Sequence, residues 1–267
     1  MGFSGWSAEA VAFFSGLQAD NTKAYWTAHK VVYEESVRGP MAELLDELSG
    51  EFGSGRIARP YRDVRFAADK SPYKTEIYAS LDRGGYVRFA ADGLTAAVGY
   101  YGMSAGQLDR YRRAVDDETS GAQLARLVAQ LRGERLEVGG AQELKSAPRG
   151  YRTDHPRIEL LRYRGLICWR HWPVAPWLHT GQAGERVAGF LRTAAPVHRW
   201  LDDNVGPDPA PPANRRRLPP ASPPGQPVGM VPPSAPKQSS RHPVPSAQLP
   251  RSAQQAQVLA GFRCAAR

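Results

Sequence analysis

The chain has 267 residues, of which 42% are hydrophobic and 23% are charged, and its formal net charge is +9. Two cysteines are too few for a disulfide framework, and no stretch approaches the roughly 20 apolar residues that a membrane span needs. The N-terminus lacks the basic and apolar regions of a signal peptide, so we expect a cytoplasmic protein that makes no membrane contact.

The positive charge is concentrated at the C-terminal end. From Pro207 to Arg267 there are eight Lys/Arg and one acid, a net charge of +7, whereas residues 1–206 hold 27 Lys/Arg against 25 Asp/Glu. The same segment carries 15 of the 23 prolines. It has too few apolar residues to offset the entropy of ordering, which predicts a globular domain at 1–206 and a disordered Pro/Arg-rich tail at 207–267.

The tail has two interpretations. Its composition fits a natural disordered linker or a shifted reading of a GC-rich gene, because 59 residues after Asp208 contain no acid. In either case the nearly neutral body holds little of the positive charge. We therefore expect any nucleic-acid binding to come mainly from the tail.

Three helices are predicted at the start of the domain. Ser7 is a good N-cap for the first helix, and Gly16 is placed to end it. Asn21 is placed to cap a second helix that runs to about Val37. Pro40 suits the first turn of a third helix that ends near residue 49.

Four short segments rich in aromatic and β-branched residues follow, separated by turn residues. They are predicted strands at Ile57–Phe66, Glu76–Leu81, Tyr86–Ala91 and Leu94–Tyr101. Asp92 and Gly93 between the last two strands are a hairpin signal. If the first two strands also pair as a hairpin, residues 62–75 lie at its end.

The second half returns mainly to helices. Ser104 with Gln107 and Ser120 with Gln123 each match the capping box that opens a helix. The remaining predicted elements are a strand at 136–138, a helix at 156–162, a strand at 166–172, and helices at 184–192 and 196–203. This order predicts an α+β fold, with an antiparallel sheet packed by helices in a single domain.

Residues 61–75, YRDVRFAADKSPYKT, concentrate charge at the predicted hairpin. Arginine offers a planar bidentate fork and lysine a mobile point charge, a combination suited to phosphate or carboxylate. In the alternative interpretation, Asp63 and Asp69 pair with these cations and the network only stabilises the fold. The predicted ligand-binding set is Arg62, Asp63, Arg65, Asp69, Lys70, Tyr73, Lys74 and Lys145.

Two long motifs resemble domain-of-unknown-function family 2461. They are Arg62-Asp63-x-Arg65-Phe66-x-x-Asp69-Lys70-x-Pro72-Tyr73-Lys74 and Lys145-x-x-Pro148-x-Gly150-Tyr151-x-x-Asp154-His155-Pro156. Shorter matches are Gly2-Phe3-Ser4, Asn21-x-Lys23-x-x-Trp26, and Pro196 with Trp200-Leu201. The resemblance covers about residues 2–206, with Arg149 where the family pattern has lysine. It implies domain bounds and sites to inspect, but no mechanism.

Two further groups of residues contain side chains suited to catalysis or metal binding. Asp154 and His155 are candidates for an acid/base pair, although Pro156 favours a simpler role for them at a helix start. Cys168-x-x-His171 with His179 lacks a second ligand pair, so we predict neither a metal nor a cofactor. Binding of an anionic ligand is the leading hypothesis, a non-enzymatic interaction or structural module is the alternative, and an enzymatic role stays open.

Overall fold

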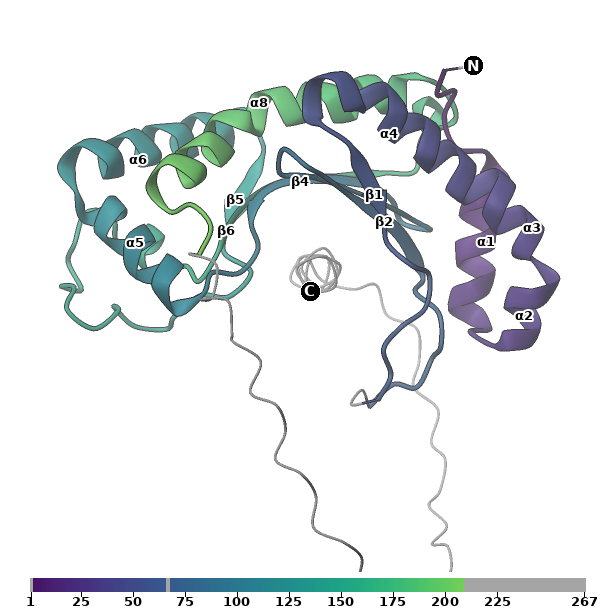
Figure 1. Cartoon of the computed structure of the whole chain (residues 1–267), viewed down its shortest axis with the longest axis horizontal. Helices are drawn as coiled ribbons and strands as arrows, with labels where there is room; N and C mark the ends of the chain where they lie inside the picture. Colours follow the sequence, from purple (N-terminus) through teal and green to yellow (C-terminus); the bar gives the residue numbers. More distant parts are fainter. Residues whose placement is uncertain (1, 66–67, 209–267) are drawn as a thin grey trace, which may run out of the picture.

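The computed structural model describes residues 2–65 and 68–208 (Figure 1). Its strands form one six-stranded sheet of order β1-β2-β3-β4-β6-β5, in which every neighbouring pair is antiparallel. The strands are β1 Gly55–Ile57, β2 Glu76–Leu81, β3 Gly85–Ala90, β4 Gly93–Tyr100, β5 Glu137–Gly139 and β6 Leu166–Pro173. The α+β class and the antiparallel sheet are therefore confirmed, whereas the predicted disorder of the tail and the end of the first predicted strand at Phe66 fall outside the described residues.

The helices come before and after the central strands. The first group is α1 Ala8–Ala19, α2 Lys23–Ala28, α3 Lys30–Val32, the π-helical segment η1 Tyr33–Arg38, and α4 Gly39–Phe52. The second group is α5 Ala105–Asp116, α6 Glu118–Gly133, α7 Ile158–Arg162, the 3-10 helix η2 Pro176–His179, and α8 Gln182–Asn204.

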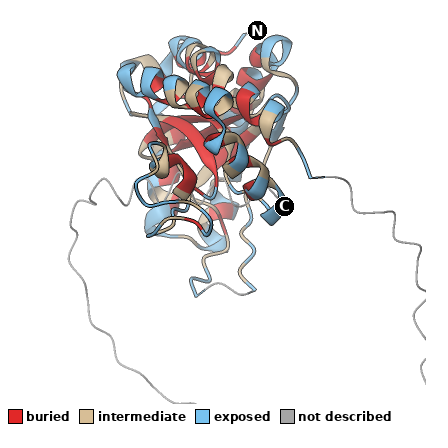
Figure 2. Cartoon of the chain, turned by 90° about the vertical axis from the view of Figure 1, so that its left-hand side faces the viewer, coloured by how far each residue is buried: buried red, intermediate tan, exposed pale blue. Residues whose placement is uncertain are grey.

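One face of the sheet packs against helices. Side chains alternate along each strand, so Ile77, Phe89 and Leu94 point to the same side, where they are buried in the main core. Trp6 stacks on Phe89 with ring centroids 4.6 Å apart. Helices α4, α6 and α8 lie above the curved sheet in Figure 1, and Figure 2 shows buried residues on the strands and on the inward sides of the helices.

The opposite face carries a separate cluster. Its buried members in the described part of the chain come from strands alone: Tyr78, Tyr86, Ala97, Ile167 and Trp169. The same alternation that sends Ile77, Phe89 and Leu94 to the helices sends these five side chains to the other side. Three of the five are tyrosine or tryptophan, which carry polar groups as well as apolar rings.

The first helices differ from the prediction at their ends. Ser7 caps α1, as expected, but the helix continues past Gly16 to Ala19. A Cβ at Gly16 would lie 2.1 Å from the hydroxyl oxygen of Tyr25, so this glycine makes room for a packed ring and does not end the helix. Thr22, not Asn21, caps α2.

Later boundaries show where tertiary contacts outweigh local signals. The capping box of Ser104 and Gln107 is present, but Asp117 caps α6 in place of the predicted Ser120. The two helices predicted at the C-terminal end form the single 23-residue helix α8, with Pro196 inside it. Nine residues of α8 are buried on both sides of the proline, and this packing sustains the helix despite the lost backbone hydrogen bond.

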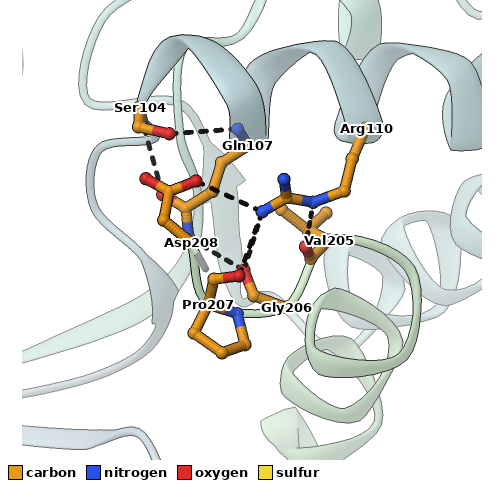
Figure 3. A network of polar contacts seen from close by, with 7 residues as sticks. All are labelled: Ser104, Gln107, Arg110, Val205, Gly206, Pro207 and Asp208. Atoms are coloured by element: carbon orange, nitrogen blue, oxygen red, sulfur yellow. Dashed lines mark hydrogen bonds and ion pairs between the residues drawn. The ribbon is translucent and has the colours of Figure 1, made fainter. Parts of the chain in front are cut away.

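The end of α8 is held by side chains of α5 (Figure 3). Arg110 donates from Nε to the carbonyl oxygen of Val205 at 2.5 Å, and from Nη2 to that of Pro207 at 3.2 Å. Gln107 donates to the carbonyl oxygen of Gly206 at 2.9 Å. These carbonyl oxygens belong to the C-cap residue Val205 and the two residues after it, so α5 fixes the path of the chain as it leaves α8.

Candidate functional site

The charged segment is an extended loop between β1 and β2. We call residues 58–75 the excursion, which reaches below the sheet in Figure 1. Its two arms meet at an isolated antiparallel bridge between Tyr61 and Tyr73, and Arg62 donates its backbone N–H to Pro72 at 2.9 Å. β1 ends at Ile57, so the predicted strand is wrong over residues 58–65, which form one arm of the excursion.

The N-terminal helices brace the excursion. The Asn21 side chain donates to the carbonyl oxygen of Tyr73 at 2.9 Å and accepts from its N–H at 3.1 Å, so it pairs with that backbone as a neighbouring strand would. The ring of Trp26 stacks on that of Tyr73 at 4.4 Å with an interplanar angle of 7°. The family pattern Asn21-x-Lys23-x-x-Trp26 therefore contains two supports of the charged segment, and the predicted helix-capping role of Asn21 is wrong.

Both carboxylates of the excursion form ion pairs with arginines. Arg65 contacts Asp63 in bidentate fashion at 2.9 and 2.7 Å, and Arg62 contacts Asp69 at 2.5 Å. Hydrogen bonding from Arg65 lowers the pKa of Asp63 to about 2. Hydrogen bonds from Ser71, followed by that from Arg62, hold the pKa of Asp69 well below its usual range. These two arginines and two acids therefore form ion pairs within the loop that stabilise its conformation.

Both lysines donate hydrogen bonds to oxygens without formal charge. Lys70 donates to the carbonyl oxygen of Val64 at 2.9 Å. Lys74 donates to the carbonyl oxygen of Arg59 at 2.7 Å and to the hydroxyl of Tyr78 at 3.0 Å. A carbonyl oxygen orients an ammonium group but does not cancel its charge. The excursion holds five Lys/Arg and two Asp, so it has a net charge of +3.

The second motif lies with a different part of the fold. Leu144, next to the predicted site residue Lys145, donates its N–H to Arg162 of α7 at 2.9 Å. The segment between β5 and α7 is at the α5 end of the molecule, opposite the excursion (Figure 1). The structure therefore places the exposed Lys145 apart from the other predicted ligand-binding residues.

Asp154 and His155 have separate partners. Asp154 forms a bidentate pair with Arg152 at 2.8 and 2.6 Å, which lowers the pKa of its carboxyl group. His155 accepts from the N–H of Arg157 at Nδ1, 3.0 Å, and its Nε2 lies 3.1 Å from Asp116 at the end of α5. These contacts join the corner before α7 to α5. The predicted helix-capping role is wrong, because the N-cap of α7 is Arg157 and no side chain caps the helix.

A polar row crosses the other face of the sheet and was missed from the sequence. Tyr78, Arg88, Thr95 and His171 lie opposite one another on β2, β3, β4 and β6. Thr95 Oγ1 lies 3.0 Å from His171 Nδ1. Burial lowers the pKa of His171, so its ring is neutral at neutral pH.

Arg88 is the centre of this row. Its buried guanidinium contacts Glu76 and, at 3.0 Å, Asp92. Burial alone lowers the pKa of Arg88, but the two acids more than offset it and raise the pKa above its ordinary value. One signal was present in the sequence: an arginine in the middle of an otherwise apolar strand, with Asp92 at the hairpin turn that follows it.

The three residues considered as metal ligands do not converge. Cys168 and His171 are three positions apart on β6 and so point to opposite faces. Burial raises the pKa of the Cys168 thiol to about 12. His179 Nδ1 lies 2.6 Å from the carbonyl oxygen of Trp6. Among residues 2–65 and 68–208, no three His, Cys, Asp or Glu side chains are grouped as a metal site.

These features define an α+β protein whose antiparallel sheet is packed by helices on one face and is extended at one edge by a cationic loop. The family model described as "Conserved hypothetical protein (DUF2461)" matches residues 9–200. The chain belongs to this family, as its two long motifs predicted.

Comparisons with solved structures and with curated proteins do not extend the family assignment. A solved structure, "Conserved hypothetical protein Pfu-178653-001 from Pyrococcus furiosus", is 13% identical, with 65% of this chain and 96% of that chain covered, at a TM-score of 0.29. A similarity at that level carries no argument about this chain. A search of curated proteins finds no match. None of the helices in the described ranges is long and apolar enough to cross a bilayer.

Proposed function

We propose that the excursion binds an anionic, phosphate-bearing ligand, as a free small molecule or within nucleic acid. The observation that carries this proposal is the charge balance of the loop. Its two carboxylates are both held by arginines, whereas Lys70 and Lys74 are oriented by neutral oxygens. Positive charge therefore remains on an extended loop that is held in shape from within.

Six of the eight residues in the predicted set take two roles in this proposal. Arg62, Asp63, Arg65 and Asp69 fix the loop by pairing with one another. Lys70 and Lys74 supply positive charge for the ligand. Arg59, which was not in the predicted set, supplies a third positive charge. Tyr61 is 51% exposed beside them and offers a ring on which a base can stack, which favours ligands that contain a nucleotide.

The test compares full-length variants in titrations with ATP and with inorganic phosphate. We expect Arg59→Ala/Lys70→Ala to weaken ATP binding by about tenfold, since each charge-assisted hydrogen bond contributes on the order of 1 kcal/mol or more. Lys145→Ala removes one cation at the other end of the molecule and serves as the control. The basic tail is the same in all variants, so its contribution cancels.

Two results would contradict the proposal. One is an unchanged affinity in Arg59→Ala/Lys70→Ala, and the other is an equal loss in Lys145→Ala, which would indicate only a general effect of net charge. A loss with ATP but not with inorganic phosphate would assign part of the affinity to the base.

A structural role of the motif is the second candidate, and the two carboxylate–arginine pairs favour it. In that case Asp63→Ala and Asp69→Ala disorder the excursion, while Arg59→Ala and Lys70→Ala leave every ligand titration unchanged. Amide chemical shifts of residues 58–75 distinguish the two candidates, because they report loop structure independently of binding.

A further inference from the structure

A cavity of about 940 Å³ lies between α8, the end of α4 and the turn that joins β2 to β3. Its volume is in the range of pockets that take small organic ligands. Much of its wall is apolar: Phe52, Leu81, Val98, Leu191 and Ala195. None of the described residues of the excursion, 58–65 and 68–75, lines it, so the proposal below does not depend on the function proposed above.

Charge at the rim of the cavity is largely balanced. Arg192 forms a bidentate pair with Glu51, at 2.8 and 2.7 Å, and Arg83 donates to the backbone carbonyl of Glu51 at 2.7 Å. The lining holds three arginines and three acids in all, so a ligand in the cavity meets an apolar wall and a rim whose acidic and basic residues balance in number. This environment favours an uncharged molecule over an ion.

Three polar side chains of the lining form a small network. Tyr100 donates its hydroxyl hydrogen to Asp202 Oδ1 at 2.7 Å, which fixes the carboxylate. The second oxygen, Asp202 Oδ2, lies 3.5 Å from His198 Nε2. That separation is too long for a strong hydrogen bond, so both atoms keep bonding capacity.

The preferred tautomer of His198 follows from its surroundings. Nδ1 is buried and has no hydrogen-bond partner within the described ranges. A buried N–H without an acceptor is unfavourable, and the carboxylate of Asp202 lies beside Nε2. The favoured tautomer therefore carries its proton on Nε2, which makes Nε2 a donor next to the acceptor Asp202 Oδ2.

Gly84 allows the imidazole to lie in this position. Its φ of +85° is one that glycine adopts readily, and a Cβ there would lie 2.0 Å from His198 Nε2. The backbone of Gly84, in the turn between β2 and β3, therefore packs directly against the imidazole of His198. That ring lies between Gly84 and Asp202.

We propose that this cavity binds an uncharged small molecule with an apolar ring body and one hydroxyl group, and that the hydroxyl bridges His198 and Asp202. The hydroxyl oxygen accepts from Nε2–H and its hydrogen is donated to Oδ2. A hydroxyl group is both donor and acceptor, so it satisfies two groups that do not satisfy each other well. The apolar wall takes the ring body.

The test uses the full-length protein and a pair of matched probes, 2-naphthol and 2-methoxynaphthalene. The two share a ring system, but the methyl ether cannot donate a hydrogen bond. We expect 2-naphthol to bind at least tenfold more tightly, measured by its fluorescence and by the shift in melting temperature. His198→Phe keeps an aromatic ring and removes the donor, so it should abolish the preference between the probes.

A second variant tests the location. Ala195→Phe fills the cavity from α8 and should abolish binding of both probes. Gly189→Phe is the control: it places the same side chain on the same helix but outside the cavity, where no atom lies within 4 Å of a new Cβ, and should leave binding unchanged. Equal affinity of the wild type for the two probes would overturn the proposal. So would a preference that persists in His198→Phe, or 2-naphthol binding that survives in a folded Ala195→Phe variant.

Discussion

Replacement of Arg88 by methionine is expected to be the most damaging single change on the polar row. The arginine side chain is 4% exposed, and its partners Glu76 and Asp92 are 17% and 36% exposed. Arg88→Met leaves the Glu76 carboxylate nearly buried without its counter-ion. Loss of one partner from a buried ion pair typically costs about 3–5 kcal/mol of the free energy of unfolding.

The two acids should not contribute equally. Glu76→Gln leaves the guanidinium with only Asp92, whereas Asp92→Asn removes a partner that water already reaches. We expect Glu76→Gln to cost about 2–3 kcal/mol, and Asp92→Asn to cost about 1 kcal/mol or less, in the range of exposed pairs. The expected loss in the free energy of unfolding therefore decreases from Arg88→Met to Glu76→Gln to Asp92→Asn, in the order in which the three side chains become more exposed.

Urea unfolding followed by tryptophan fluorescence measures these differences, with unchanged m-values as the check that only stability has changed. The double variant Arg88→Met/Glu76→Leu removes both buried charges and should recover at least half of the loss in Arg88→Met. The reasoning is refuted if Asp92→Asn costs as much as Glu76→Gln, or if the double variant is less stable than Arg88→Met.

Three further predictions concern other parts of the molecule. Asn21→Ala removes both hydrogen bonds to the backbone of Tyr73, so it should lower the free energy of unfolding by about 2 kcal/mol and shift the amide resonances of residues 58–75. The pKa of Asp63 is lowered to about 2, so its carboxylate stabilises the folded state above its unfolded pKa of about 4, and this contribution is lost as the pH falls toward 2. The free energy of unfolding of Asp63→Asn, measured over the same acid range, should lack that loss. Identical pH profiles of the variant and the wild type would contradict the assignment. In a Cys264→Ser background, the buried Cys168 should react with a thiol reagent only at the rate of unfolding, and rapid native-state labelling would show that the thiol is accessible.

The fold class was predictable because it depends on local patterns. Short aromatic and β-branched segments bounded by turn residues located β2, β3, β4 and β6 to within about one residue, and Gly93 correctly marked the hairpin between β3 and β4. The capping box at Ser104 opened α5 where it was expected. Each of these signals lies within a few residues of the element that it defines.

The site was harder to predict because its partners are distant in the sequence. The charged residues of the excursion were recognised, but the sequence did not show that Asn21 would brace Tyr73 from 52 positions away. Arg88 was missed because an isolated arginine in a strand does not reveal which acids lie beside it. Lys145 was grouped with the excursion by the family motifs, and its position beside α7 depends on the path of the chain between β5 and β6.

The side-chain pairing of Asn21 with Tyr73 has a consequence for folding and exchange. The amide hydrogen of Tyr73 is bonded to a side chain near the start of α2, so its protection from solvent exchange depends on docking of the N-terminal helices and not on the sheet. A contact across 52 residues also closes a long loop, which delays the excursion relative to the neighbouring hairpin of β3 and β4. The cationic loop should therefore be among the last parts of the chain to become ordered, and a partial opening of α2 would release it while the sheet stays intact.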